Sequence, residues 1–498
     1  MNSTLTLPTT RIGEHLDVCG VATGLWQVAG GHGTIEFDKA VEAMRSIYDR
    51  GFTTFDMADH YGPAEDIAGV FYEQVKNEGF PGGRPRIMTK WVPEPGNMNE
   101  AVVREAVERA LTRLRTDRVD LIQFHWWDYL DPGYLTAMEG LTGLKEEGLI
   151  GEIGFTNFDT AHARILAGMG FSFASNQVHF SLLDDRAAGD MSGFCGESGM
   201  KLLCYGTVAG GFLSDRWLGR AEPSFEEVSG NWSLMKYLRF IRATGGWATF
   251  QDLLSVLSGI SEKHEVSISN VATRWVLEHE AVASVLIGNR LGLSEHLDDN
   301  LKIFGFELDA EDHEAIARVK AGSERLPGDC GDEYRKPPFL TAAGDLSDHK
   351  THAWRLPLVK RHPDTGAGDT TFDSGTVWED IAGFSRAVRR GNTIHVSGTT
   401  ATLLGKAVPP GNAASQAEVC IDKIEAAVEA LGGRLEDVIR TRIYVPRLED
   451  DWEAVARVHG RRFAGIRPAN TLVGASLVGD EYLVEMEAEA VIPEEKRI

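Results

Sequence analysis

Four residues of this chain have the types and spacing to move a proton to or from a carbonyl group. They are Asp56 and Tyr61 in FDMADHYG, Lys90 in IMTKW and His125 in DLIQFHWW. A tyrosine acid that is activated by a lysine, with the lysine held by an aspartate, can deliver a proton to a carbonyl oxygen. The set predicts acid–base chemistry, provided that the fold brings the four side chains to one place.

The surrounding elements predict that they do converge, because apolar runs alternate with amphipathic stretches through the first two-thirds of the chain. Helical spacing is clearest in 99–115, where Val103, Val107 and Leu114 share one face. Eight strand–helix units predict a (β/α)₈ TIM barrel, in which the carboxyl ends of all strands form one rim. The expected strands are 20–26, 52–57, 86–91, 119–125, 150–155, 174–180, 201–206 and 283–288, and helical patterns cover 37–51, 99–115, 133–148 and 160–170.

The pattern predicts three parts: a barrel at 1–320, a barrel tail and linker at 321–371, and a second domain at 372–498. The linker is rich in Pro, Gly, Asp and charge and has little periodicity. The second domain reads as α+β. Its expected strands are 392–401, 438–446, 469–477 and 482–492, and its expected helices are 415–433 and 450–465.

Composition excludes several classes of function. The chain has 498 residues, 43% hydrophobic and 25% charged, with a formal net charge of −24, which disfavours nucleic-acid and anionic-membrane partners. No window has the roughly 18 consecutive apolar residues of a membrane span, and no signal peptide is evident. The five cysteines are scattered without CxxC pairs and predict reduced thiols in a cytoplasmic protein. The fifteen histidines lack HxxxH or HExxH spacing, so we expect no metal.

Residues of about 10–320 resemble the aldo-keto reductase family, and the likeness is spread over the whole barrel. The resemblance implies that Asp56, Tyr61, Lys90 and His125 are the family's catalytic tetrad. Tyr61 would be the general acid in reduction, with its pKa lowered from about 10 by the Lys90 ammonium. Asp56 would hold Lys90 charged, and His125 would orient the carbonyl by hydrogen bonding.

The same resemblance implies a nicotinamide cofactor. Thr156 and Asn157 in GFTNF and Gln177 in SNQVHF match positions that bind the nicotinamide carboxamide, and Tyr205 matches the aromatic residue that stacks on the ring. No GxGxxG follows an early strand, so a Rossmann site is not expected. The segment VLIGNRLGLSEHLDDN resembles the part that binds the adenosine end. There Arg290 would pair with a 2′-phosphate, favouring NADPH over NADH, while Asp299 and Asn300 would face the adenine.

Four tryptophans stand at or just past the expected strand ends: Trp26, Trp91, Trp126 and Trp127. They predict an aromatic-lined pocket for a flat or apolar carbonyl substrate. The alternative is that some of them only pack under loops, and we expect about half to contact substrate. The loop 213–250 also shapes this pocket, and the sequence leaves its conformation open.

Residues of about 372–498 resemble the Rid (YjgF) family, on GFSRAVRRGNTIHVSGTTA and RPANTLVGASLVGDEYLVEMEAEAV. The resemblance implies a chorismate-mutase-like α+β fold, a trimer, and hydrolysis of imines or enamines. The active-site match is incomplete. Asn470 stands where active members have a carboxylate-binding arginine, and Phe384 stands where tyrosine is usual. Glu485 keeps the water-orienting carboxylate, so the domain could handle an imine, bind a ligand or serve assembly.

Three functions remain open at this stage. The first is NADPH-dependent reduction of a carbonyl or an imine, with the Rid-like domain assembling an oligomer or handling an imine intermediate. The second is NAD(P)-dependent oxidation of a sugar or secondary alcohol, since the tetrad's chemistry is reversible. The third is a nucleotide-binding scaffold without turnover, against which the intact tetrad counts.

Overall fold

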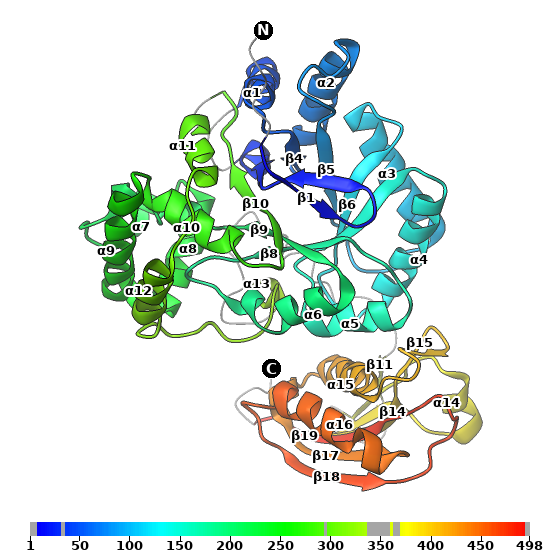
Figure 1. Cartoon of the computed structure of the whole chain (residues 1–498). Helices are drawn as coiled ribbons and strands as arrows, with labels where there is room; N and C mark the ends of the chain where they lie inside the picture. The colour runs from blue at the N-terminus through cyan, green and yellow to red at the C-terminus, as the bar shows by residue number, and fades with distance from the viewer. Residues whose placement is uncertain (1–6, 31–34, 293–295, 336–358, 362–368, 494–498) are drawn as a thin grey trace. The chain divides into compact units, whose positions relative to one another are not determined.

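The computed structural model describes residues 7–30, 35–292, 296–335, 359–361 and 369–493. Two compact units are present, one holding a closed barrel and the other holding the C-terminal sheet (Figure 1). Each unit is described by itself below. Within the described residues, no helix is both long and apolar enough to span a membrane.

The first unit is an eight-stranded parallel barrel with helices around it, which confirms the predicted TIM barrel. The barrel closes where the last strand pairs with the first, through Val285↔Val21 and Leu286↔Ala22. All eight strands fall on the predicted apolar runs. They are β3 (Val21–Gly24), β4 (Thr54–Asp56), β5 (Arg86–Trp91), β6 (Val119–His125), β7 (Ile150–Thr156), β8 (Ser175–His179), β9 (Lys201–Tyr205) and β10 (Val282–Gly288).

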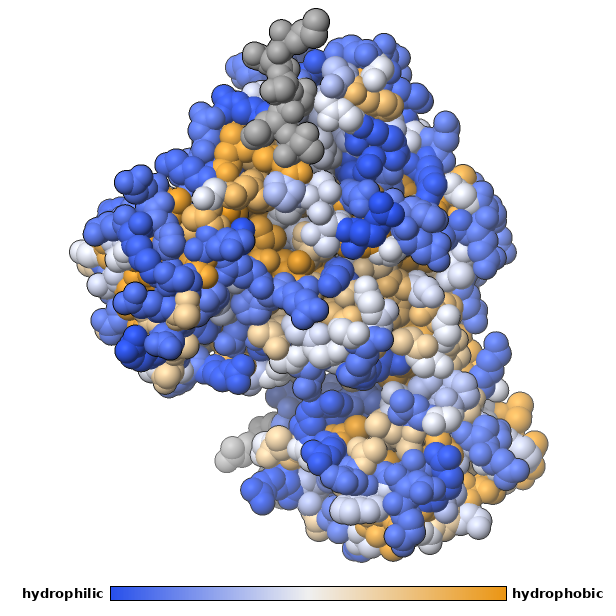
Figure 2. Space-filling view, viewed as in Figure 1, coloured by the Kyte–Doolittle hydropathy of each residue, from blue (hydrophilic) through white to orange (hydrophobic). Residues whose placement is uncertain are grey.

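Amphipathic helices alternate with the strands, and each turns its apolar face inward. In α3, the predicted face residues Val103, Val107 and Leu114 are buried. The helices that follow in chain order up to residue 335 are α1 (Phe37–Asp49), α2 (Ala64–Asn77), α3 (Glu100–Leu114), α4 (Gly133–Glu146), α5 (Thr160–Gly168), α6 (Asp190–Ser198), α7 (Phe225–Val228), α8 (Trp232–Ala243), α9 (Gly246–His264), α10 (Ile268–Leu277), α11 (Leu297–Leu301), α12 (Ala310–Lys320) and α13 (Asp332–Arg335). The face drawn in Figure 2 is mainly hydrophilic over the outer sides of these helices.

A short hairpin that the sequence did not reveal covers the amino-terminal end of the barrel (Figure 1). Its strands are β1 (Thr9–Ile12) and β2 (Leu16–Cys19). Ile12, Leu16 and Val18 pack with Ala174 and Ala283 in a buried cluster. The two alanines lie at or just before the start of their strands, so the hairpin fills the barrel at the end opposite the carboxyl rim.

The second unit is a seven-stranded mixed sheet in the order β11-β12-β13-β14-β19-β17-β18, and two helices pack on it. This confirms the predicted α+β fold, and α16 makes the crossover between the parallel strands β17 and β18. The strands β11 and β12 lie in the segment assigned to the linker, yet both pair into this sheet. The elements are β11 (Val359–Arg361), β12 (Thr370–Phe372), α14 (Val377–Ala382), β13 (Ala387–Arg390), β14 (Thr393–Thr400), β15 (Thr402–Leu403), β16 (Lys406–Ala407), α15 (Ala413–Ala430), β17 (Val438–Val445), α16 (Leu448–Arg462), β18 (Ala469–Gly474) and β19 (Glu485–Val491), of which β15 and β16 form a separate ribbon.

Candidate active site

The four proposed catalytic residues line one cavity of about 680 Å³ at the carboxyl rim of the barrel. Asp56 is the last residue of β4, Lys90 lies near the end of β5, and His125 ends β6. Tyr61 lies in the loop between β4 and α2. Parallel strands deliver their carboxyl ends to one rim, which explains how residues up to 69 positions apart come together.

A buried ion pair forms the floor of this site. The Nζ of Lys90 donates to Oδ2 of Asp56 at 2.5 Å and to the backbone oxygen of Met57 at 3.0 Å, and both charged side chains are 3% exposed. The other carboxylate oxygen of Asp56 accepts from Gln123 at 2.7 Å and from Gln177 at 2.8 Å. Asp56 therefore has three side-chain donors, which keep the carboxylate beneath Lys90.

Gln123 is a functional residue that the sequence reasoning missed. It lies two positions before His125 on β6, so both side chains point into the barrel, and it also accepts from Gln177 at 2.7 Å. The signal was present: an amide side chain in the strand VDLIQFH, which the sequence predicts to be buried, needs a buried partner.

The electrostatics of the acid differ from the sequence expectation. Lys90 lies 5.1 Å from the centre of the Tyr61 ring, as expected for neighbours. However, burial raises the pKa of Tyr61 well above 10, and the carboxylates of Asp56 and Asp59 raise it further. The pKa of Tyr61 is therefore raised and not lowered as predicted, because burial and the two carboxylates dominate. Burial lowers the pKa of Lys90, although the Asp56 carboxylate opposes the shift.

These opposite shifts predict which group loses its proton first as pH rises. Tyr61 must be protonated to act as an acid, so its contribution is present below its pKa and lost above it. Because the pKa of Lys90 is lowered and that of Tyr61 is raised, the alkaline fall of kcat/KM should follow Lys90. A pH–rate profile checks this, together with a tyrosinate difference spectrum of wild type against Tyr61→Phe. A phenolate signal from Tyr61 that appears with or before the activity loss would contradict it.

The residues expected to hold the nicotinamide also line the cavity. Thr156 ends β7, and its buried Oγ1 has no hydrogen-bond partner among the described residues, so a ligand amide could satisfy it. Asn157 follows with φ at +55° and accepts from the Tyr205 hydroxyl at 2.9 Å. Gln177 is committed to Asp56 and Gln123, so in this state it supports the ion pair.

The residues expected at the adenosine end lie along the same cavity. Arg290 is exposed and follows β10, where its guanidinium can meet an anionic group. Asn300 is buried in α11. Asp299 accepts from Ser267 at 2.8 Å and from Asn270 at 3.1 Å, so its carboxylate fastens α11 to the start of α10.

The four tryptophans divide into two pairs. Trp26 and Trp127 line the cavity, and the Trp127 ring lies 4.0 Å from the ring of His125. Trp91 and Trp126 do not line it. They are 4% and 0% exposed, and both pack on Phe124 at ring distances of 5.3 and 5.7 Å. Assigning those two to the substrate pocket was wrong, because their side chains point into the layer between strands and helices.

This division predicts different effects of two substitutions. Trp26→Phe should raise KM for an aromatic aldehyde several-fold and leave stability within about 0.5 kcal/mol, as for a residue at a cavity wall. Trp91→Phe should lower the free energy of unfolding by about 1–3 kcal/mol and leave KM unchanged, because the loss leaves a void in packed surroundings. Steady-state kinetics and urea denaturation measure both, and a KM effect from Trp91→Phe would contradict the assignment.

A second missed feature is the segment after the barrel. Residues 329–335 fall in the part expected to be tail and linker, yet Tyr334 lines the cavity. Its ring lies 5.8 Å from that of His125 and 5.6 Å from that of Trp127. Lys236 of α8, inside the loop whose conformation the sequence left open, donates to the Tyr334 hydroxyl at 2.7 Å. No periodicity marks this Gly- and Asp-rich stretch, so sequence patterns could not find it.

The second unit does not bring its three predicted site residues together. Asn470 donates to Thr441 at 2.9 Å, while Glu485 pairs with Tyr444 across β19 and β17. Thr441 and Tyr444 are three positions apart on one strand, so their side chains leave opposite faces of the sheet. Asn470 therefore lies on the face covered by α16, away from Glu485.

Phe384 and Glu485 share a neighbour that the sequence reasoning did not single out. The Arg386 guanidinium lies 5.5 Å from the Phe384 ring and donates to the Gly398 backbone oxygen at 2.5 Å. Glu485 fills the space left by the missing side chain of Gly398. Burial raises the pKa of Glu485, Glu487 raises it further, and Arg386 opposes the shift.

Comparison with known proteins fits both units. The aldo/keto reductase family profile matches residues 21–321, and the profile described as Endoribonuclease L-PSP, which is the Rid/YjgF family, matches residues 377–492. The chain belongs to the aldo/keto reductase family and is an NAD(P)H-dependent oxidoreductase with a C-terminal Rid/YjgF domain. Both predicted resemblances are thereby confirmed.

Individual relatives cover each unit. The chloroplastic pyridoxal reductase of Arabidopsis thaliana is 26% identical over 58% of this chain and 79% of its own length. An uncharacterised protein of Streptomyces coelicolor is 36% identical over 24% of this chain and 87% of its own length.

Two solved structures share the barrel fold. The glycerol dehydrogenase of Gluconobacter oxydans has a TM-score of 0.54 at 23% identity and covers 64% of this chain and 97% of its own. An aldo-keto reductase of Bombyx mori, solved in complex with NADP, has a TM-score of 0.51 at 16% identity and covers 68% and 100%.

Proposed function

We propose that the barrel reduces a carbonyl substrate with NADPH as hydride donor and Tyr61 as proton donor. The observation that carries the proposal is the buried Lys90–Asp56 pair, which lies beside Tyr61 and His125 in one tryptophan-walled cavity. The raised pKa of Tyr61 keeps the phenol protonated at neutral pH, as a general acid requires. A charge developing on the phenolate oxygen would be stabilised by the Lys90 ammonium.

The cofactor proposal rests on the chain's own residues and on the family. The unsatisfied Thr156 hydroxyl and the Asn157 side chain fit a carboxamide, and the exposed Arg290 fits a 2′-phosphate. When bound, NADPH supplies the hydride. Tyr61 supplies the proton, His125 holds the carbonyl oxygen, and the walls formed by Trp26 and Trp127 exclude water from the reacting carbon.

The substrate class proposed is a flat aromatic aldehyde or ketone. Two indole rings at the cavity wall favour planar apolar ligands, and the pyridoxal reductase among the relatives acts on an aromatic aldehyde by its name. The direct test is NADPH oxidation at 340 nm by the full chain, with aromatic aldehydes, ketones and cyclic imines as substrates. Tight NADPH binding without turnover of any of them would reject the reductase and favour a nucleotide-binding scaffold. Turnover of secondary alcohols with NADP⁺ alone would favour the dehydrogenase direction.

For the C-terminal domain we propose a role in assembly, with a trimer expected from the Rid family. The separation of Asn470 from Glu485 and the absence of an arginine at 470 disfavour hydrolysis of 2-imino acids by the family's carboxylate contact. Light scattering of the full chain tests the trimer, and a monomer would reject it. Hydrolysis of a 2-imino acid by the Tyr61→Phe variant would show instead that the domain is catalytic.

A further inference from the structure

Three consecutive residues after the barrel each contact a residue proposed to bind the nicotinamide. A carboxylate oxygen of Glu333 lies 3.3 Å from the Tyr205 hydroxyl, and the same hydroxyl lies 3.2 Å from that of Tyr334. Arg335 donates to the backbone oxygen of Asn157. These residues lie beyond position 321, where the match to the family profile ends. The contacts therefore belong to this chain's own tail, defined here as residues 329–335.

The tail is anchored by buried charges rather than by apolar packing alone. Arg186 donates to Asp184 at 2.8 and 2.6 Å, to Glu333 at 2.7 Å and to the backbone oxygen of Asp329 at 2.9 Å. Asp329 in turn accepts from the backbone nitrogen of Thr160 at 2.8 Å. One guanidinium thus joins a loop after β8 to the tail at two positions, Asp329 and Glu333.

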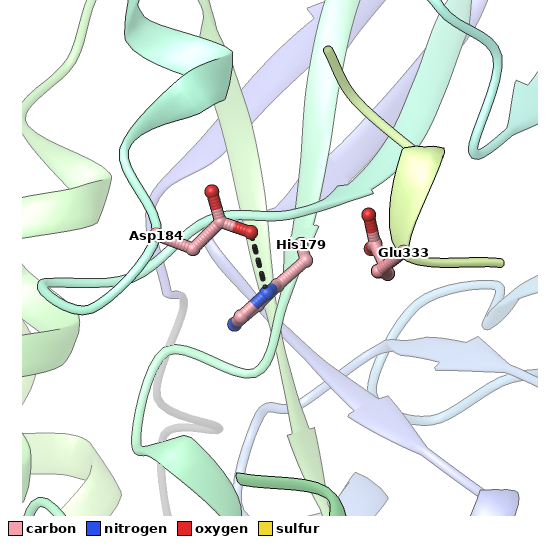
Figure 3. Close-up of side chains that lie close together, drawn as sticks. All are labelled: His179, Asp184 and Glu333. Carbon is pink, nitrogen blue, oxygen red and sulfur yellow. Dashed lines mark ion pairs between the residues drawn. The ribbon is translucent and has the colours of Figure 1, made fainter. Parts of the chain in front are cut away.

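His179, Asp184 and Glu333 lie close together in this anchor, as Figure 3 shows. A metal ion could use such a trio, but Arg186 already donates to both carboxylates, so a positive charge occupies their centre. Burial is the largest effect and would raise the pKa of Glu333, but Arg186, His179 and Lys236 together lower it, which keeps the carboxylate ionised. The trio is an ion-pair network and lies directly beneath Tyr205, whose ring stacks 5.7 Å from that of His179 at 20°.

Tyr334 is fixed from a second side. Lys236 donates to its hydroxyl at 2.7 Å, and the Lys236 ammonium lies 4.7 Å from the Tyr334 ring and 5.2 Å from the Tyr205 ring. The rings of Tyr205 and Tyr334 are therefore held between the ion-pair network of Arg186 and the helix α8. A ring fixed in this way is preorganised for a planar ligand, so binding costs less conformational entropy.

We propose that Glu333 and Tyr334 are positioning residues that set the Tyr205 ring and the Asn157 amide for the nicotinamide of the cofactor. This proposal rests on the proposed NADPH-dependent function. Neither residue is assigned a role in the chemistry: each acts through Tyr205. The barrel's cofactor site is complete only with the tail in place.

Substitutions in the full chain test the proposal. Tyr334→Phe keeps the ring and removes the hydroxyl that contacts Tyr205 and Lys236. Glu333→Leu removes the acceptor and the pair with Arg186. The Kd for NADPH should rise about fivefold in Tyr334→Phe and at least about tenfold in Glu333→Leu, in line with the loss of one or more hydrogen bonds. Glu333→Gln keeps an acceptor oxygen and should recover part of the affinity.

The decisive comparison uses a fragment of the cofactor. The 2′-phosphorylated ADP-ribose lacks the nicotinamide, so its Kd should stay within twofold of wild type in all three variants. A merely structural defect would weaken the fragment and NADPH alike and would overturn the proposal. Unchanged binding of NADPH in both Tyr334→Phe and Glu333→Leu would also overturn it.

The second unit offers matched controls. Glu487 there accepts from the Tyr444 hydroxyl at 3.0 Å and from Arg442 at 2.9 Å, the same arrangement of a glutamate, a tyrosine and an arginine. Glu487→Leu and Tyr444→Phe should leave the Kd for NADPH unchanged. Wild type that binds NADPH but turns over no substrate would reject the proposed function alone. The comparison of Kd values would then still test whether Glu333 and Tyr334 position Tyr205. Wild type that binds no nucleotide would reject both.

Discussion

Replacing Tyr61 by phenylalanine is expected to lower kcat for carbonyl reduction by about 10²–10⁴-fold, the usual contribution of a positioned general acid. Phenylalanine keeps the ring beside Lys90 and removes only the hydroxyl that carries the proton. Among the residues that the structure describes, no hydrogen bond depends on that hydroxyl, so the fold and the cavity should persist. The Kd for NADPH should therefore remain within about twofold, and the loss should lie in the rate of reduction.

Single-turnover measurement of NADPH oxidation separates the chemical step from product release in this variant. Tyr444→Phe in the other unit serves as the control, because it removes a tyrosine hydroxyl far along the chain from the tetrad, one that contacts Glu487. Full activity in Tyr61→Phe would reject Tyr61 as the acid. The proton donor would then have to be another group of the cavity, with His125 the first to test.

Lys90→Met is expected to reduce the free energy of unfolding of the barrel by about 3–5 kcal/mol and to abolish reduction. Removing one partner of a buried ion pair leaves the other charge uncompensated, and here both side chains are 3% exposed. Gln123 and Gln177 still donate to Asp56, but two neutral amides cannot balance a full negative charge. Urea denaturation followed by tryptophan fluorescence measures the loss.

The double variant Asp56→Asn/Lys90→Met is the matched control for that prediction. It removes both charges at once, so it should be less destabilised than Lys90→Met alone, while remaining inactive. If the double variant lost as much stability as the sum of the two single variants, the pair would not be energetically coupled. The contact between Nζ of Lys90 and Oδ2 of Asp56 would then contribute little to the free energy of unfolding.

The barrel was predictable because each strand reads as an apolar run and the segments 37–51, 99–115, 133–148 and 160–170 show a helical pattern. The segments that failed carry neither signal. The hairpin at 9–19 spans two four-residue strands, and only Ile12, Leu16, Val18 and Cys19 of it are buried in the core. The tail at 329–335 is held by ion pairs and hydrogen bonds to Arg186, Lys236 and Asn157, and such contacts between distant positions leave no local pattern.

The site residues could be predicted where residue type alone defines the role. They were predicted less well where the role depends on the direction in which the side chain points. Asp56, Lys90 and His125 lie at or next to the ends of strands that must point to one rim, so their convergence followed from the fold. Trp91 and Trp126 occupy similar places along their strands, yet their side chains point outward from the barrel interior. The pKa of Tyr61 also depends on how much water the surrounding loops exclude, which no spacing along the chain reveals.

The hairpin of β1 and β2 restricts ligand access to one end of the barrel. It stoppers the amino-terminal end of the barrel, and the catalytic and cofactor residues share one cavity at the other end. Cofactor and substrate must therefore enter and leave through the same opening, one after the other. A nucleotide whose ring rests on Tyr205 would be covered by a substrate seated between Trp26 and Trp127, so the kinetics should show a compulsory order, with nucleotide first to arrive and last to leave.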